Sequence, residues 1–205
     1  MISIPLFFAL VIGFNHAFEA DHVLAVGNIA NKRSKLLLAV KDGMYWGLGH
    51  TSMIFLVGCL IILAKWTVDV AQFEKFEVLV GLSMIALGGW RVYKYFKSES
   101  KEHNLPHDHN HKLAYGMGLV HGLAGSGAVV LLALTDISST LESLMYLILF
   151  GLGSVVGMMI VAGLFNIPFF KKLHMQKSVQ LGFVVLSAVL CVGYGSFMVV
   201  SYFTA

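Results

Sequence analysis

The sequence predicts an all-α membrane protein with about six transmembrane helices, arranged as an inverted repeat of three plus three helices. The first reason is composition: 58% of the 205 residues are hydrophobic, 12% are charged, and the mean hydropathy is +0.80. Soluble domains are about 45–50% apolar and about 25% charged. The two further reasons are a set of long apolar windows and a similarity of the chain to itself.

Six apolar windows are each long enough to cross a bilayer, whose hydrocarbon core needs about 20 apolar residues per helix. They cover residues 3–29, 38–64, 77–97, 113–134, 143–166 and 179–203. The remaining loops are short, so we expect no soluble domain. The first window lacks the basic flank and small-residue cleavage site of a signal peptide, so we expect it to stay as a membrane helix.

Basic residues are unevenly distributed among the loops. Of the 14 Lys and Arg residues, only Lys65 and Lys75 fall outside the loops that follow the first, third and fifth windows and their flanks. Cytoplasmic loops carry the excess of Lys and Arg, so these three loops are predicted to be cytoplasmic and both termini to lie outside. We therefore expect a multi-pass protein of the cell membrane, in which the basic excess reports topology and does not indicate nucleic-acid binding.

The chain resembles itself when it is shifted by about 105 residues. The segments that begin at Gly13, Gly47 and Gly88 align with those that begin at Gly118, Gly151 and Gly195, at offsets of 105, 104 and 107. A unit of three spans must reverse its orientation when it is repeated, and inverted repeats are typical of secondary transporters. The expected organisation is repeat 1 over residues 1–97, a His-rich cytoplasmic loop over 98–112, and repeat 2 over 113–205.

Polar and ionisable residues interrupt the first window, in the stretch that contains Asn15, His16, Glu19, Asp21 and His22. Ionisable groups inside a membrane cost about 2.5–3.5 kcal/mol each and are functional by default. The alternative is that the first span ends near residue 14 and that this cluster lies at the membrane interface. An apolar stretch resumes directly afterwards, which favours placement within the membrane.

The spacing within this cluster does not suit a straight helix. His16 and Asp21 lie about 140° apart at about 100° per residue, so donors from one regular helix would not converge. Either the helix unwinds here, or each side chain reaches a different neighbour. In the repeat mate, Gly122, Gly125 and Gly127 stand at the corresponding level. We expect them to allow the fourth helix to approach the first closely, or to serve ordinary small-residue helix packing.

Two imidazoles and a carboxylate suit a divalent transition metal, because imidazole prefers Ni, Co, Cu and Zn whereas Mg and Ca prefer oxygen ligands. The second window adds His50, with Thr51 and Ser52 beside it, and the fourth window adds His121. A single His in a membrane span is also a common hydrogen-bonding core residue. Asn15, Glu19, Thr51, Ser52 and His121 are therefore secondary candidates.

At these residues the sequence resembles the nickel/cobalt transporter family. HAFEADH, from His16 to His22, resembles its H-x4-D-H signature, and GLGHTS around His50 resembles its second motif. VHGLAGSGA, from Val120, resembles the six-span UreH-like branch. The resemblance implies transport of Ni(II) or Co(II), as substrate and not as a permanent cofactor, with His16, Asp21, His22 and His50 as ligands. Asn15 and Glu19 stand where many members have Arg and Asp, which leaves metal preference and direction open.

The loop between the third and fourth windows is rich in histidine. It contains His103, His107, His109 and His111. Short His-rich tracts bind transition metals, so this loop is expected to buffer ions at the cytoplasmic side, the alternative being an inert solvated linker. A metallochaperone or a metalloenzyme maturation factor is the partner that such a role implies.

Several functions compete on the sequence alone. The favoured one is uptake of a divalent metal driven by the membrane potential, because the chain has no GxxxxGK[ST] motif for ATP and no sign of an enzyme. Efflux of the same metals is the first alternative. The others are a thiol–disulfide electron carrier, which would need Cys59 and Cys191 to meet, and a metal sensor or assembly factor that transports nothing.

Overall fold

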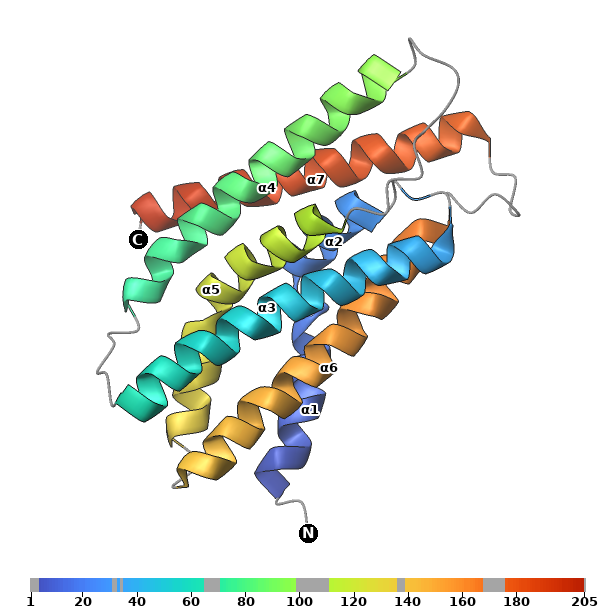
Figure 1. Cartoon of the computed structure of the whole chain (residues 1–205). Helices are drawn as coiled ribbons and strands as arrows, with labels where there is room; N and C mark the ends of the chain where they lie inside the picture. The colour runs from blue at the N-terminus through green and yellow to red at the C-terminus, as the bar shows by residue number, and fades with distance from the viewer. Residues whose placement is uncertain are drawn as a thin grey trace.

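The computed structural model describes residues 4–30, 33, 35–64, 71–98, 111–135, 139–167 and 176–204. Seven α-helices cover almost all of this described part (Figure 1). In chain order they are α1 (Ile4–His16), α2 (Ala20–Ala30), α3 (Leu36–Ala64), α4 (Ala71–Ser98), α5 (Lys112–Thr135), α6 (Thr140–Asn166) and α7 (Lys177–Thr204). Five of the six predicted windows therefore each correspond to one continuous helix, α3 to α7.

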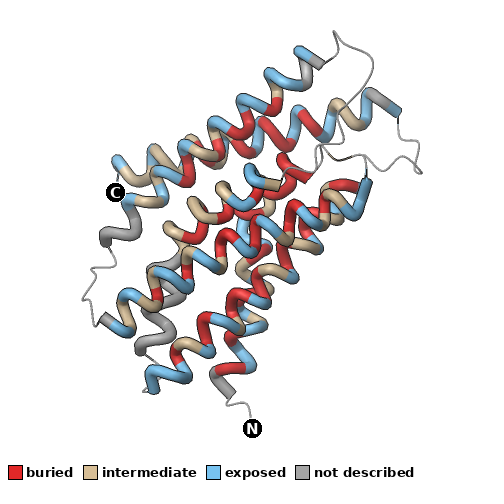
Figure 2. The backbone as a smooth tube through the Cα atoms, in the orientation of Figure 1, coloured by how far each residue is buried: buried red, intermediate tan, exposed pale blue. Residues whose placement is uncertain are grey.

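The outer surface of the bundle is apolar, as a lipid-facing surface must be. Among the described residues, four helices are long and apolar enough to cross a membrane, over Leu36–Leu63, Lys75–Lys94, Thr140–Asn166 and Ser178–Thr204. Large side chains such as Leu141 and Phe203 are 68% and 75% exposed on them. Buried positions line the faces that the helices turn toward one another (Figure 2). The chain is thus an all-α, multi-pass membrane protein, and the count of six spans stays a prediction.

The first window is not one helix. It divides into α1 and α2, which are separated by a turn at Ala17–Glu19. The amides of Phe18 and Glu19 donate to the carbonyls of Asn15 and His16, which closes α1, and the Glu19 carbonyl accepts from the Val23 amide, which starts α2. The first window is therefore not one continuous helix, and of the two readings left open for this stretch the interrupted helix is the one found.

Four pairs of helices pack as close neighbours. α3 lies between α5 and α6, α1 lies against α6, and α4 lies alongside α7, with α2 in the middle of the bundle (Figure 1). Glycines set the closest approaches: a side chain at Gly13 would overlap the Phe150 backbone, and one at Gly118 would overlap the Trp46 backbone. These contacts join α1 to α6 and α5 to α3. The close approach of α5 is therefore to α3. A Cβ at Gly122 would likewise overlap the His50 backbone, so of the two readings left open for that glycine ordinary helix packing is the one found.

Polar side chains on α6 and α7 fix the two halves of the interrupted helix. The Ser154 hydroxyl of α6 donates to the Gly13 carbonyl of α1 at 3.0 Å. The Asn166 amide of α6 donates to the carbonyls of Ala30 and Arg33 at 3.0 and 2.8 Å, which satisfies the carboxyl end of α2. Asn28 of α2 donates to the Ser187 carbonyl of α7 at 3.0 Å. These bonds hold the turn between α1 and α2 at a fixed level of the bundle.

We expect Gly118→Ala to destabilise the protein by about 1–3 kcal/mol, because the added methyl group would overlap the Trp46 backbone and push α5 away from α3. The control is Gly193→Ala on α7, where an added Cβ meets no atom within 4 Å. Thermal unfolding of both purified variants in detergent checks this. Equal midpoints for the two variants would contradict the packing described here.

Candidate metal centre

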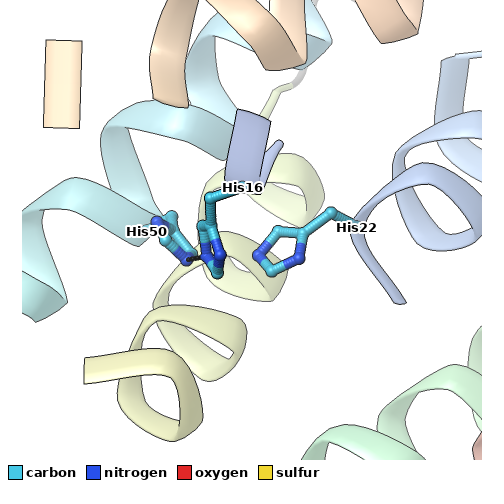
Figure 3. Close-up of side chains that lie close together, drawn as sticks. All are labelled: His16, His22 and His50. Atoms are coloured by element: carbon cyan, nitrogen blue, oxygen red, sulfur yellow. Dashed lines mark hydrogen bonds between the residues drawn. The ribbon is translucent and has the colours of Figure 1, made fainter. Parts of the chain in front are cut away.

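Three imidazoles from two parts of the chain converge inside the bundle. His16 ends α1, His22 lies in the first turns of α2, and His50 lies near the middle of α3, and the three rings point toward one another (Figure 3). The Nε2 atoms of His16 and His50 are 3.2 Å apart. The ring centroid of His22 is 4.5 Å from that of His16 and 4.9 Å from that of His50. One donor nitrogen from each ring lies within 4.8 Å of the other two.

These spacings suit a shared metal ion. Two imidazole nitrogens bound to one tetrahedral ion at about 2.0–2.1 Å lie about 3.3 Å from each other. The Nε2 atoms of His16 and His50, which share a hydrogen bond at 3.2 Å, are already close to this separation. His50 and His22 have 0% and 2% of their surface exposed, so both rings are shielded from competing water. Within the described residues, His22 Nε2 and His50 Nδ1 are buried atoms with no hydrogen-bond partner.

The opposite ring nitrogens of two of these histidines face carboxylates. His16 Nδ1 lies 2.9 Å from a Glu19 oxygen, and His22 Nδ1 lies 2.9 Å from Asp21 Oδ1. Since a carboxylate accepts, each Nδ1 carries the hydrogen, and each Nε2 is left as an unprotonated donor toward the cluster. Metal-binding histidines typically have this second contact, which fixes both the tautomer and the ring orientation.

A second group of ligand atoms lies beside the first and shares one residue with it. Donor atoms of Glu19, Asp21 and His22 also come within 4.8 Å of one another. The Glu19 side chain is 59% exposed and that of Asp21 is 18% exposed, so this group faces the surface of the bundle. It follows that oxygen donors lie on the accessible side of His22 and nitrogen donors on the buried side.

Comparison with known proteins gives the family. The chain is 35% identical over 170 residues to the urease accessory protein UreH of Bacillus sp. strain TB-90, covering 78% of this chain and 75% of that protein. The chain belongs to the nickel/cobalt transporter family, in its UreH-like branch. It is also 38% identical over 66 residues to the nickel transporter NixA of Staphylococcus aureus, which spans 30% of this chain and 19% of NixA.

A more distant relative comes from a plant. The chain is 26% identical over 157 residues to the chloroplast protein FOR GROWTH AND FERTILITY 1 of Arabidopsis thaliana, covering 67% of this chain and 42% of that protein. No model of a protein family matches the chain, and no solved structure matches it.

In this member of the nickel/cobalt transporter family, three of the secondary candidates lie away from the imidazoles. Asn15 is exposed at the end of α1. Thr51 donates to the Gly151 carbonyl of α6 at 3.2 Å, and Ser52 donates to the Leu48 carbonyl of its own helix at 2.7 Å. His50, Thr51 and Ser52 follow one another on a regular helix, about 100° apart, so only His50 faces the cluster.

The remaining predicted residues divide between the cluster and the loop. His121 of α5 is buried next to His22, with a ring centroid separation of 5.5 Å. His103, His107 and His109 lie outside the described residues. His111 is distant from the cluster: its Nδ1 lies 2.6 Å from Asp42 Oδ1, and its ring stacks on Tyr45.

Sequence reasoning missed the buried carboxylate of Asp42. This side chain is 1% exposed and accepts two hydrogen bonds from the Arg33 guanidinium in addition to the contact with His111. It lines a cavity of about 310 Å³ together with Arg33, Arg91 and Lys94. Three cationic groups against one carboxylate disfavour a divalent cation there. The available signal was an acidic residue inside the apolar window over residues 38–64.

We expect Asp21→Asn to weaken Ni(II) binding by about 10–100-fold, because the His22 ring would lose the charged acceptor that orients it. Ser52→Ala is the control, since that hydroxyl donates to the Leu48 carbonyl of its own helix. Isothermal titration of the purified proteins with Ni(II) measures the difference. An affinity that Asp21→Asn leaves unchanged would show that Asp21 neither binds the ion nor orients a ligand.

Proposed function

We propose that this protein carries Ni(II) or Co(II) across the cell membrane, in the direction of uptake, through the site formed by His16, His22 and His50. The observation on which this depends is that one nitrogen from each of three imidazole rings lies close to the other two inside the bundle. In two of these rings the opposite nitrogen contacts a carboxylate. Such a donor set selects a divalent transition metal over Mg²⁺ or Ca²⁺. The names of two relatives, a nickel transporter and a urease accessory protein, support this substrate.

The proposed path uses the two groups of donors in turn. A hydrated ion first meets Glu19 and Asp21, whose oxygens lie on the accessible side. It then exchanges water for the nitrogens of His16 and His50, while His22 belongs to both groups. Oxygen donors tolerate a partly hydrated ion, and the buried imidazoles replace its water. The shared His22 means that the ion can move inward without at any time losing all its protein ligands.

The proposed transport mechanism is alternating access between two inverted repeats. Equivalent positions of the two halves make reciprocal contacts: Gly13 packs on Phe150 as Gly118 packs on Trp46. Gly81 likewise packs on Gly195, and Gly88 packs on Ala188. Contacts of this kind support a twofold relation between residues 1–97 and 113–205, and an interrupted helix at the centre is typical of such carriers.

The membrane potential supplies the driving force in this scheme. A doubly charged ion gains about 4–5 kcal/mol per 100 mV when it moves toward a negative interior. With both termini outside, the loop over residues 98–112 lies in the cytoplasm, where its histidines receive the ion. We propose a metallochaperone or a maturation factor of a metalloenzyme as the recipient, in keeping with the name of the Bacillus relative.

The competing functions receive less support. Efflux uses the same ligands, and expression in a metal-sensitive host separates it from uptake, because an exporter protects the host. A thiol–disulfide carrier needs two cysteines that meet. Cys59 is on α3 and Cys191 is on α7, two helices that do not pack as neighbours, and the Cys191 thiol donates to the Met84 carbonyl.

We expect His16→Gln, His22→Gln and His50→Gln each to lower Ni(II) uptake into proteoliposomes at least about tenfold, because each removes a nitrogen ligand worth more than about 1.4 kcal/mol. A Ni(II)-sensitive dye inside the vesicles measures the rate. His111→Gln is the matched control, since that imidazole contacts Asp42 instead of the cluster. Wild-type rates in all three variants would refute the site.

We also expect Co(II) to compete with Ni(II) for uptake, whereas Mg²⁺ and Ca²⁺ at a hundredfold excess do not, because imidazole nitrogen is a poor ligand for these two ions. The same proteoliposomes, with each competitor added outside, provide the measurement. Strong inhibition by Mg²⁺ would indicate that oxygen ligands, such as Glu19 and Asp21, determine selectivity alone.

A further inference from the structure

We infer that His121 of α5 is the fourth ligand of the transported ion, and that it joins the site when the ion binds. This inference rests on the proposed function and extends it, because it brings a residue of the second repeat into a site built by the first. His121 is 1% exposed and lies beside His22, at a ring centroid separation of 5.5 Å.

The hydrogen bonding of His121 prepares it as a ligand. Its Nδ1 lies 3.1 Å from the Met117 carbonyl oxygen, which only accepts, so Nδ1 carries the hydrogen. Its Nε2 is therefore an unprotonated donor, and among the described residues this buried atom has no hydrogen-bond partner. His16 and His22 are held in the same way, each by an oxygen at Nδ1. A buried lone pair without a partner is costly in a purely structural histidine.

The packing around His121 repeats that around His16. The His16 ring lies 5.3 Å from that of Phe150, and the His121 ring lies 4.7 Å from that of Trp46. The residues that align in the repeat are His16 with His121 and Trp46 with Phe150. His121 thus occupies in the second half the place that a member of the imidazole cluster occupies in the first.

The same face of α5 also borders the cluster directly. Gly125 follows His121 by one helical turn, and a Cβ there would lie 3.6 Å from His16 Nε2 and 3.7 Å from His50 Nε2. The missing side chain leaves space next to the two donor atoms. α5 therefore contributes the His121 nitrogen as a donor, and Gly125 leaves space beside the place where the ion would bind.

His121 does not belong to the group of donors that lie within 4.8 Å of one another, which contains His16, His22 and His50. To complete a four-nitrogen shell, its ring must move inward, by rotation or by a small shift of α5. A four-coordinate transition metal gains a ligand through that movement. Binding would then draw the second half of the protein toward the first, which is the kind of rearrangement that alternating access requires.

The test counts the ligands of bound Ni(II) or Co(II) by X-ray absorption at the metal edge, using purified full-length protein. We expect four imidazoles in the wild type and three in His121→Gln, with His111→Gln unchanged at four. His121→Cys provides a positive signal, because a thiolate would add a sulfur at about 2.3 Å. The visible absorption of Co(II) reports the same change.

An equal imidazole count in the wild type and His121→Gln, together with no sulfur ligand in His121→Cys, would overturn the inference. Because the count is made on bound metal and not on flux, it is independent of whether the protein transports. Four imidazoles without uptake would reject the proposed function and keep this ligand, whereas three imidazoles with normal uptake would do the reverse.

Discussion

The structure depends on one constraint: three imidazole rings must be buried together with their Nε2 atoms facing one another. Among the described residues this arrangement leaves His22 Nε2 without a hydrogen-bond partner, and a buried polar atom without a partner is costly. It persists here because the outer nitrogens of His16 and His22 are held by Glu19 and Asp21, and because close helix packing closes the space around His50. The glycine contacts of α5 and α6 with their neighbours thus serve the site as well as the bundle.

Much of the fold could be predicted from hydropathy, since lipid imposes the same demand on every span. Five windows gave five helices to within a few residues, except that α4 begins earlier than residue 77. The interruption of the first window had no Gly or Pro signal at Ala17, Phe18 and Glu19, and the spacing of the polar cluster offered it only as one of two readings. It is fixed by tertiary contacts from α6, chiefly the bond from Ser154 to the Gly13 carbonyl of α1 and the bond from Asn166 to the Ala30 carbonyl at the end of α2.

The sequence predicts which residue types could bind a metal ion, but it does not predict which way each side chain points. An imidazole or a carboxylate inside a membrane span is conspicuous, so His16, His22 and His50 could be found from the sequence. Thr51 and Ser52 could not be excluded in advance, because the sequence does not show which face of their helix turns toward the other imidazoles. Asp42 was overlooked because it lies next to basic residues near the start of the second window, where a charged side chain is expected.

The interruption of the first helix has an electrostatic consequence for a doubly charged ion. α1 ends at His16 and presents its partly negative carboxyl end to the site, which favours a cation, whereas α2 begins there and presents its partly positive amino end. Asp21, in the first turn of α2, and Glu19, just before it, offset that positive end. In the proposed function the two carboxylates therefore have two roles, since they orient the imidazoles and also cancel the helix field that would repel the ion. A continuous helix through residues 4–30 would supply neither free helix end, which is a physical reason for the proposed ion site and the turn to coincide.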